Sequence, residues 1–355
     1  MKGRAQAREE DALRRRPALA VTVGDPCGVG PEIVLKALAV DLTSAAARLV
    51  AIGDEANLRQ TARQLKLRWP FGAVVRELPA DPRWDKPLLL DLGDVDPALL
   101  PGQISGPAGR AAADAIEKSV ELCMAGRLDG VVTAPIHKEA LSLAGFSDPG
   151  HTEMLARLTR TPRVAMLFWT EDFSVALLST HMSLSQAIRK VRRRAVLGQL
   201  VFVEREWRRL TGQRPRIVVA GLNPHSSEGG RFGLEEAQHL APAIEAARAK
   251  GLSVDGPAPP DSVFQMARDG RYDLVLALYH DQGTIPVKFG YGRRAVNVTL
   301  GLPFVRTSVD HGTAMDIAGK GVASEDSLVQ AILLGARLIQ SRWASGKRGA
   351  ARRDR

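Results

Sequence analysis

The sequence predicts an α/β protein whose sheet is largely parallel, with some antiparallel pairing. Short apolar runs rich in Val, Leu, Ile and Ala alternate with stretches in which apolar residues recur at helical spacing. A length of 355 residues favours two domains over a single core. Because no apolar run reaches the roughly 18 residues of a membrane span, we expect a cytoplasmic protein that does not contact a membrane.

The chain begins its α/β pattern with an apolar run over 18–23, a glycine-rich loop over 24–30 and a helix over 31–39. Pro31 suits the first helical turn, and Glu32 complements the positive end of the helix. The same reasoning predicts further strands at 49–53, 88–90, 130–133, 164–168, 173–178 and 296–300. It predicts helices at 109–125, 152–158, 183–211, 235–250, 261–269 and 327–341, while residues 60–105 are proline-rich and otherwise irregular.

Three apolar runs end in a histidine: VALLST-His181, IVVAGLNP-His225 and LVLALY-His280. Each run has the composition of a buried strand, and the ends of parallel strands share the sheet edge where ligands bind. One such histidine is usually only hydrogen-bonded or solvated, but three, with Asp281 beside them, suggest a divalent metal with open coordination positions. Asp261 fits either this site or the N-cap of a helix.

Two segments are suited to anions. Gly150-His151-Thr152-Glu153 opens a helix, where backbone N–H groups favour negative charge. Lys288, Asn297 and Arg306 follow the third histidine at short intervals and could clamp a phosphate. Spacing alone favours surface solvation for the two cations, and a turn or strand-edge hydrogen bond for Asn297.

Two glycine-rich segments differ in what they suggest. Residues 24–32, GDPCGVGPE, match neither the dinucleotide nor the P-loop fingerprint and favour a tight structural turn. Residues 310–321, DHGTAMDIAGKG, form a compact polar loop against which a nucleotide could lie, with Asp316 accepting from ribose hydroxyls; an ordinary connection is the alternative. The absence of GxSxG, HExxH and CxxC weakens hydrolase, zincin and thiol-redox interpretations.

The net charge of +10 is concentrated at the ends of the chain. Residues 1–17 contribute +3 and residues 342–355 contribute +5, which leaves about +2 for the body. We expect disordered basic tails over 1–17 and 343–355, without a nucleic-acid partner because no aromatic stacking pattern accompanies them. Cys27 and Cys123 are far apart, which argues against a disulfide framework and a thiolate metal site.

Seven motifs make the chain recognisable: GDPCGVGPEI, VVTAPIHKEAL, GHTEML, STHMSL, NPHSSEGG, YHDQG and VNVTLGLPFVRTSVDHGTAMDIAGKG. Over about residues 18–340 it resembles the 4-hydroxythreonine-4-phosphate dehydrogenase (PdxA) family. The resemblance implies an oxidoreductase that needs NAD or NADP and one divalent metal per active site, such as Zn, Mg or Co. It further implies oxidation of 4-phosphohydroxy-L-threonine to 2-amino-3-oxo-4-phosphooxybutanoate, which decarboxylates to 3-amino-2-oxopropyl phosphate in pyridoxal phosphate biosynthesis.

The resemblance also implies roles for individual residues. It makes His181, His225 and His280 metal ligands supplied by both subunits of a homodimer, with Asp261 and Asp281 maintaining the catalytic site. The implied substrate contacts are His151, Thr152, Lys288, Asn297 and Arg306. The implied cofactor contacts are His311, Gly312, Thr313, Ala314, Asp316 and Ile317.

The implied fold is isocitrate/isopropylmalate dehydrogenase-like, with two α/β domains and a cleft between them, and it binds NAD without a GxGxxG loop. We expect residues 18–135 plus 300–342 to form the first domain and 136–299 the second, with the dimer interface. Ser226-Ser227 departs from the usual Ala-Gly, and 283–288 is closer to a branch that oxidises 4-phospho-D-threonate or 4-phospho-D-erythronate. The serine pair is also similar to a branch acting on aromatic cis-dihydrodiols, but GHTEML and the Lys288, Asn297 and Arg306 set favour a phosphorylated substrate.

Overall fold

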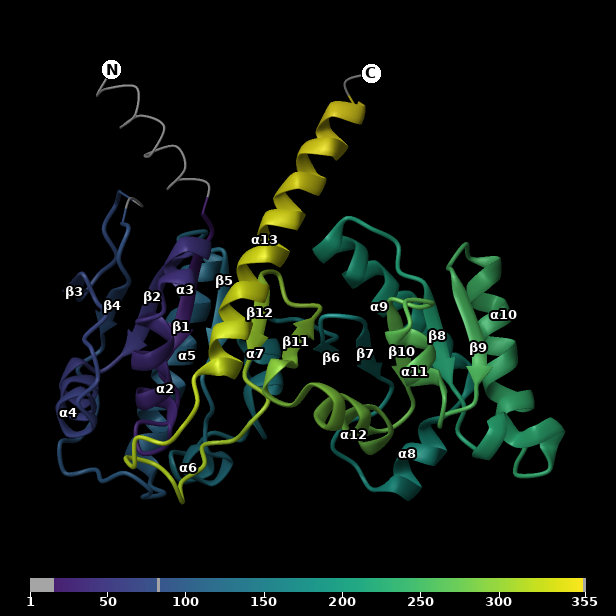
Figure 1. Ribbon diagram of the computed structural model, residues 1–355, viewed down its shortest axis with the longest axis horizontal. Helices are drawn as coiled ribbons and strands as arrows, with labels where there is room; N and C mark the ends of the chain where they lie inside the picture. Colours follow the sequence, from purple (N-terminus) through teal and green to yellow (C-terminus); the bar gives the residue numbers. More distant parts are fainter. Residues whose placement is uncertain (1–15, 82–83, 354–355) are drawn as a thin grey trace. The chain divides into compact units, whose positions relative to one another are not determined.

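The computed structural model describes residues 16–81 and 84–353, with side chains up to residue 345 (Figure 1). The chain forms two compact units. Unit 1 comprises Met1–Val164 and Leu302–Gln340, and unit 2 comprises Ala165–Gly301 and Ser341–Arg355. The expected tail over 1–17 lies almost entirely outside the described residues. None of the described helices is long and apolar enough to cross a membrane.

Unit 1 is built on parallel strands in the order β3-β4-β2-β1-β5-β12. Their bounds are β1 Ala18–Thr22, β2 Arg48–Gly53, β3 Ala73–Val75, β4 Leu88–Asp91, β5 Gly130–Thr133 and β12 Val305–Ser308. Except for β3, these strands are buried along their whole length. Continuous apolar runs of this kind are typical of a parallel sheet covered on both faces.

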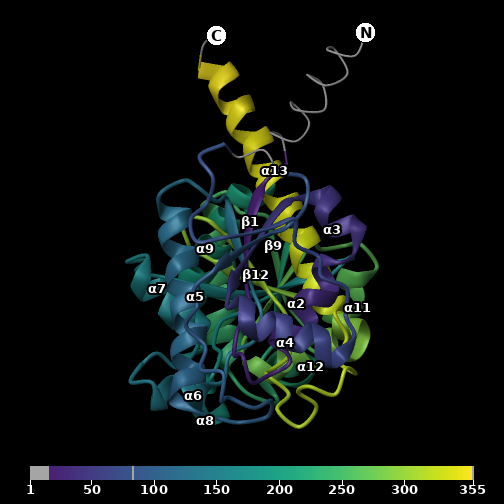
Figure 2. The same ribbon diagram turned by 90° about the vertical axis from the view of Figure 1, so that its left-hand side faces the viewer.

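Helices cover both faces of the unit 1 sheet. They are α2 Gly30–Leu38, α3 Asp41–Ala46, α4 Glu55–Leu65, α5 Gly106–Met124, α6 Lys138–Leu143, α7 His151–Leu158 and α13 Asp326–Arg353. Figure 2 shows the strands between α5 on one side and α2 and α3 on the other. Helix α5 packs so closely on α6 that a Cβ at Gly109 would lie 2.0 Å from the carbonyl oxygen of Ala140.

The boundary between the units differs from the expected one. Residues 136–164 belong to unit 1 instead of the second domain. The reason is their packing: Leu141, Met154 and Leu155 lie in the same apolar core as Ile116 of α5. The segment therefore completes the core of the first unit.

Unit 2 has the strand order β11-β6-β7-β10-β8-β9. Strand β6 is antiparallel to both of its neighbours, and β7, β10, β8 and β9 run parallel. The bounds are β6 Ala165–Trp169, β7 Ser174–Leu177, β8 Ile217–Ala220, β9 Val254–Ala258, β10 Leu274–Ala277 and β11 Val296–Leu300. The helices are α8 Leu184–Lys190, α9 Arg193–Thr211, η1 Pro224–Gly230, η2 Glu236–Leu240, α10 Ala241–Ala249, α11 Val263–Arg268, α12 His280–Tyr291 and η3 Gly292–Arg294. The predicted antiparallel pair and the largely parallel α/β sheet are both confirmed.

Three local expectations need correction. The helix expected over 183–211 is two helices, because the chain is extended at Val191 and Arg192. Residues 60–105 are less irregular than expected: besides the strand predicted at 88–90, which is β4, they contain β3 and the last part of α4. The chain is helical through Arg353 instead of becoming disordered at 343, and its Ala, Arg and Lys residues are good helix formers.

Candidate active site

The three strand-end histidines lie at one edge of the unit 2 sheet. Strand β10 pairs in parallel with β7 on one side and with β8 on the other, so the carboxyl ends of these three strands are neighbours. His181 follows β7, His280 follows β10 and His225 follows β8. The parallel pairing on which the site prediction depended is therefore present.

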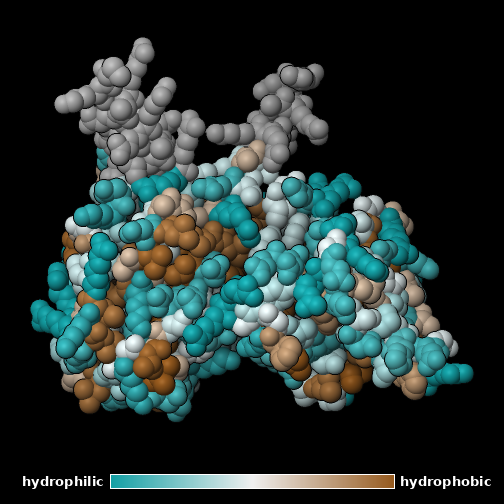
Figure 3. All heavy atoms as spheres, in the orientation of Figure 1, coloured by the Kyte–Doolittle hydropathy of each residue, from teal (hydrophilic) through white to brown (hydrophobic). Residues whose placement is uncertain are grey.

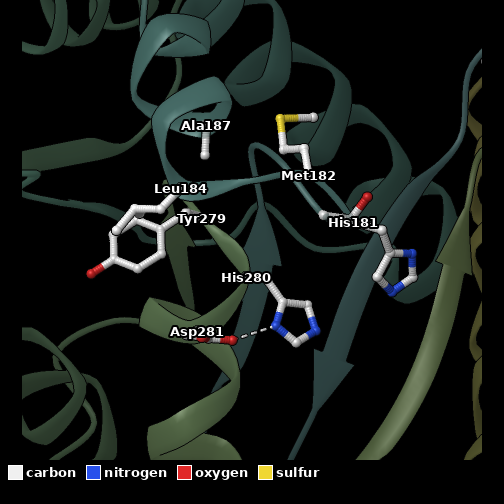
Figure 4. A pocket seen from close by; sticks show the side chains of 8 residues that line it. His181, Met182, Leu184, Ala187, Tyr279, His280 and Asp281 are labelled. Atoms are coloured by element: carbon white, nitrogen blue, oxygen red, sulfur yellow. Dashed lines mark hydrogen bonds and ion pairs between the residues drawn. The ribbon is translucent and has the colours of Figure 1, made fainter.

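His181 and His280 converge on a common cavity (Figure 4). Their ring centroids are 5.8 Å apart, with an angle of 42° between the ring planes. The cavity has a volume of about 240 Å³ and is lined by Thr180, His181, Met182, Leu184, Ala187, Tyr279, His280 and Asp281. Two imidazoles beside an open volume leave room for both a cation and a small ligand.

Asp281 orients the His280 imidazole. Its Oδ1 lies 2.7 Å from His280 Nδ1. A carboxylate only accepts hydrogen bonds, so this contact places the ring proton on Nδ1 and leaves Nε2 as the donor atom for a metal ion. This contact is compatible with the supporting role that the resemblance implies for Asp281.

The buried side chain of Gln282 links two of the loops in which the histidines lie. The Oε1 of Gln282 accepts a hydrogen bond from the backbone N–H of Leu278, and its Nε2 donates to the carbonyl of Gly221, each over 2.7 Å. Ser179 donates to the carbonyl of Leu278 over 2.8 Å. Sequence reasoning missed Gln282 and Ser179, although YHDQG and VALLST contain them. They fix the loops after β7, β10 and β8 against one another.

His225 lies in a strained loop. Residues 225–229 all have positive φ values between 44° and 73°, and four of them are not glycine. The Oε1 of Glu236 accepts hydrogen bonds from the backbone N–H groups of Leu222 and Asn223, both over 2.8 Å. Ser227 is buried and donates its hydroxyl to the carbonyl of Gly233 over 2.7 Å. Strain of this kind persists only where surrounding contacts maintain it, and it is concentrated at functional sites.

The third histidine does not join the other two within one chain. No group of three His, Cys, Asp or Glu side chains in the described part of the chain lies close enough to hold a metal ion. The His225 ring lies instead near Phe232, with 6.4 Å between the ring centroids. One chain thus brings together two of the three predicted ligands.

The remaining predicted residues of unit 2 occupy separate elements. Asp261 lies exposed before α11, whose N-cap is Ser262, so the N-cap interpretation of Asp261 is wrong. Lys288 is exposed on α12. Asn297 lies opposite Phe168 in β11, and its buried Oδ1 has no hydrogen-bond partner among the described residues. A buried amide oxygen without a protein partner can accept a hydrogen bond from a ligand.

Unit 1 contains a second polar cluster, around Arg306. Its guanidinium is buried, and Nη2 donates to Thr133 Oγ1 over 2.6 Å. Burial lowers the pKa of Arg306 to about 9, against the opposing charge of Glu153, so the guanidinium stays protonated at neutral pH. Burial, followed by the charge of Arg306, holds the pKa of His151 well below its usual value.

His151 is therefore a neutral imidazole close to a buried cation. Its Nε2 is buried and has no hydrogen-bond partner within the described residues. His151 and half-buried Thr152 open α7, whose N-terminal N–H groups favour an anion. This cluster has the chemistry of a site for a phosphate or a carboxylate.

The predicted cofactor residues lie in a loop that follows β12, which we call the 309–323 loop. Its Thr313 carbonyl accepts a hydrogen bond from the N–H of Val29 over 3.0 Å. A Cβ at Gly28 would lie only 3.0 Å from Thr313. Asp316 is exposed, and a hydrogen bond of 3.1 Å from the N–H of Ile317 to the carbonyl of Ala314 closes a turn beside it.

The glycine-rich segment 24–30 thus provides the surface on which this loop lies. Gly24 has a φ of +77°, and a Cβ there would lie 2.3 Å from the carbonyl oxygen of Pro135. The interpretation of GDPCGVGPE as a structural turn is consistent with this packing. What sequence reasoning missed is that the turn contacts the loop near the other end of the chain.

Comparison with known proteins assigns the chain to a family. The model described as "Pyridoxal phosphate biosynthetic protein PdxA" matches residues 45–335. The chain belongs to the PdxA family. The family resemblance found in the motifs is therefore confirmed over most of the chain.

Relatives within the PdxA family have two different names. A "D-threonate 4-phosphate dehydrogenase" of Cupriavidus necator is 43% identical over 329 residues, covering 92% of this chain and 98% of the relative. A "4-hydroxythreonine-4-phosphate dehydrogenase" of Beijerinckia indica is 44% identical over 323 residues, covering 90% and 94%. The crystal structure of the Klebsiella pneumoniae 4-hydroxythreonine-4-phosphate dehydrogenase is 40% identical, with a TM-score of 0.83 and coverage of 92% and 98%.

Proposed function

We propose that this chain catalyses the NAD(P)⁺-dependent and divalent-metal-dependent oxidation of a secondary alcohol in the 4-phosphate of a four-carbon hydroxy acid. The observation that carries the proposal is the convergence of His181 and His280 on one cavity at the carboxyl edge of parallel strands. The names of the relatives support dehydrogenase chemistry on a phosphorylated substrate. The buried cluster of Arg306 and His151 supports an anionic ligand.

The donor set fits a divalent metal ion. His181 and His280 would hold it, with Asp281 fixing the ring of His280. When bound, such an ion lowers the pKa of the reacting hydroxyl and stabilises the developing negative charge. Imidazole ligands, with no cysteine among the residues that line the cavity, favour Zn²⁺ or Co²⁺ in that role.

We propose that a homodimer completes the site by bringing His225 into the ligand set. Two features support this. One chain gathers only two of the imidazoles within its described residues. In addition, apolar side chains remain exposed on the helices that follow His181 and begin at His280. Leu184 on α8, which lines the cavity, and Ile285 and Phe289 on α12 are 57%, 64% and 94% exposed. Figure 3 shows apolar surface over α8 and α12 at the lower edge of the view.

Substrate and cofactor would be held by the remaining residues. Arg306, His151 and Thr152 would bind anionic groups of the substrate, and Lys288 and Asn297 would contribute further contacts. His311 and Asp316, with the neighbouring backbone of Gly312 to Ala314 and Ile317, would hold the nicotinamide cofactor. These contacts fix the reacting carbon relative to the hydride acceptor, which is the main contribution a protein makes to such a reaction.

The reaction removes a hydride from C3 of the substrate, with NAD(P)⁺ as acceptor, and a proton from the C3 hydroxyl. The product is a β-keto acid, which loses CO₂ through an enolate. From 4-phosphohydroxy-L-threonine this gives 3-amino-2-oxopropyl phosphate, and from D-threonate 4-phosphate it gives dihydroxyacetone phosphate. Both substrates are candidates, since relatives of either name are about equally similar to this chain.

The experiment is an assay of NAD(P)H formation with D-threonate 4-phosphate, D-erythronate 4-phosphate and 4-phosphohydroxy-L-threonine, before and after chelation. We expect turnover with one of them, loss of turnover with chelator and recovery with added Zn²⁺, Co²⁺ or Mg²⁺. His280→Ala should abolish turnover, while the control His239→Gln, from another histidine of unit 2, should keep it. Full turnover by the chelated enzyme, or by His280→Ala, would refute the proposal.

A further inference from the structure

Two side chains of α2 hold the end of the 309–323 loop. The Glu32 carboxylate accepts hydrogen bonds from the backbone N–H of Gly321 over 3.2 Å and from that of Ala323 over 2.9 Å. Lys36 donates to the carbonyls of the same two residues, over 3.1 Å and 2.6 Å. Lys36 also donates to Glu32 Oε1 over 2.7 Å, which closes the network. We call Glu32 and Lys36 the α2 clamp.

The α2 clamp is largely excluded from water. Glu32 is 1% exposed, and the Lys36 side chain is 18% exposed. A carboxylate in such a position is maintained only by strong partners, because burying an ion without them is costly. Here the partners are one ammonium group and two backbone N–H groups, so the clamp is strong only while the loop stays in place.

The same helix approaches the loop at a second point. Val29, the N-cap of α2, donates its backbone N–H to the carbonyl of Thr313, and Gly28 lies directly against the Thr313 side chain. The loop is therefore attached to the start of α2 at Thr313 and to the α2 clamp at Gly321 and Ala323. The exposed stretch between these points includes Asp316.

We propose that Glu32 and Lys36 are positioning residues for cofactor binding: they pre-organise the 309–323 loop in the conformation that receives the nicotinamide cofactor. The inference rests on the proposed function, which assigns the cofactor to this loop. A loop that is ordered before binding loses less conformational entropy when the ligand arrives. The Glu of the GDPCGVGPE motif thus acts on the cofactor through the loop and does not touch it.

The test measures loop mobility and cofactor affinity separately. Glu32→Gln removes the charge, and Lys36→Met removes the ammonium while keeping the apolar stem. Glu32→Gln leaves one acceptor oxygen for the two loop N–H groups, and Lys36→Met removes both hydrogen bonds to the loop carbonyls. Either change should weaken NADH binding by about tenfold or more, measured by NADH fluorescence without substrate. Amide hydrogen exchange over 309–323 should be faster in both variants. At saturating cofactor, kcat should change by less than about threefold, because the clamp acts on binding.

The control variants separate this role from general stability. Glu55→Gln breaks another ion pair four residues apart, with Arg59 on α4 of the same unit, at 2.6 Å. It should leave exchange over 309–323 and NADH affinity unchanged. Lys36→Arg keeps the cation and should recover most of the affinity.

Each failure has a distinct meaning. Unchanged exchange over 309–323 in Glu32→Gln would refute the clamp itself. Faster exchange with unchanged NADH affinity would refute its role in cofactor binding. If NADH binds but Asp316→Ala does not weaken binding, the cofactor does not use this loop. That result would overturn the assignment in the proposed function, and the inference with it.

Discussion

Replacing Thr133 with valine tests the anion site without changing its shape. Thr133 Oγ1 is buried and accepts a hydrogen bond from Arg306 Nη2 over 2.6 Å. Valine keeps the volume and removes the acceptor. A hydrogen bond to a charged group contributes about 1.5–3 kcal/mol. Without the Thr133 hydroxyl, one N–H of the buried Arg306 guanidinium loses its acceptor. We expect this loss to be divided between folding stability and anion binding.

The sheet provides a matched control. Thr22 of β1 pairs in register with Thr133 of β5, so the two side chains lie on the same face. Thr22 is equally buried, but its Oγ1 has no hydrogen-bond partner among the described residues. Thr22→Val therefore removes a buried hydroxyl that makes no hydrogen bond to the described residues, and we expect unchanged or slightly higher stability.

The assay compares KM for the phosphorylated substrate and Ki for inorganic phosphate in the two variants. Thr133→Val should raise both constants by about 5- to 30-fold, which corresponds to roughly 1–2 kcal/mol. Thr133→Ser, which keeps the hydroxyl, should stay close to the parent protein. If Thr133→Val and Thr22→Val behave alike in KM, Ki and thermal unfolding, the hydroxyl of Thr133 does not orient Arg306 and the reasoning fails.

Three further changes probe other parts of the chain. Burial, followed by repulsion from nearby acids, raises the pKa of Asp94 to about 6. Because the carboxyl ionises more readily in the unfolded chain, the free energy of unfolding falls as pH rises from about 4 to 6. Asp94→Asn should therefore stabilise the protein by about 1–2 kcal/mol above pH 6 and by nothing below about pH 4, in denaturant titrations at several pH values. Gly24→Ala should destabilise unit 1 by more than about 2 kcal/mol, because the new Cβ meets Pro135 at positive φ, and an unchanged thermal transition would contradict this. Phe289→Asp should dissociate the proposed homodimer in light scattering and reduce turnover, whereas a fully active monomer would show that one chain completes the site.

The sequence predicted the strand ends well because two signals agree there. Apolar runs of four to six residues identify buried strands, and a histidine follows each of β7, β8 and β10. Parallel pairing then places them at one edge. Composition and alternation along the chain are local properties, so they could be recognised without any long-range contact.

Other features depend on contacts between distant residues and could not be predicted in that way. Helix α12 was missed because Gly283 and Pro286 lie within it. Packing nevertheless requires a glycine at position 283, because a Cβ there would lie 2.6 Å from the side chain of Leu177 in β7. Glu32 was interpreted only through the helix dipole, since its partners Gly321 and Ala323 are 289 and 291 residues away in the sequence. No local pattern reports such a pairing.

The strained loop around His225 connects these observations to the site. Four consecutive non-glycine residues in the left-handed region each cost on the order of 1 kcal/mol. Glu236 offsets part of this cost by binding the backbone of Leu222 and Asn223, and Ser227 adds a buried hydrogen bond to Gly233. A loop needed only to connect β8 to η2 could avoid the strain with glycine. The chain keeps side chains there and stabilises the loop through Glu236 and Ser227. Since strain of this kind is concentrated at functional sites, it supports the proposal that His225 is a metal ligand.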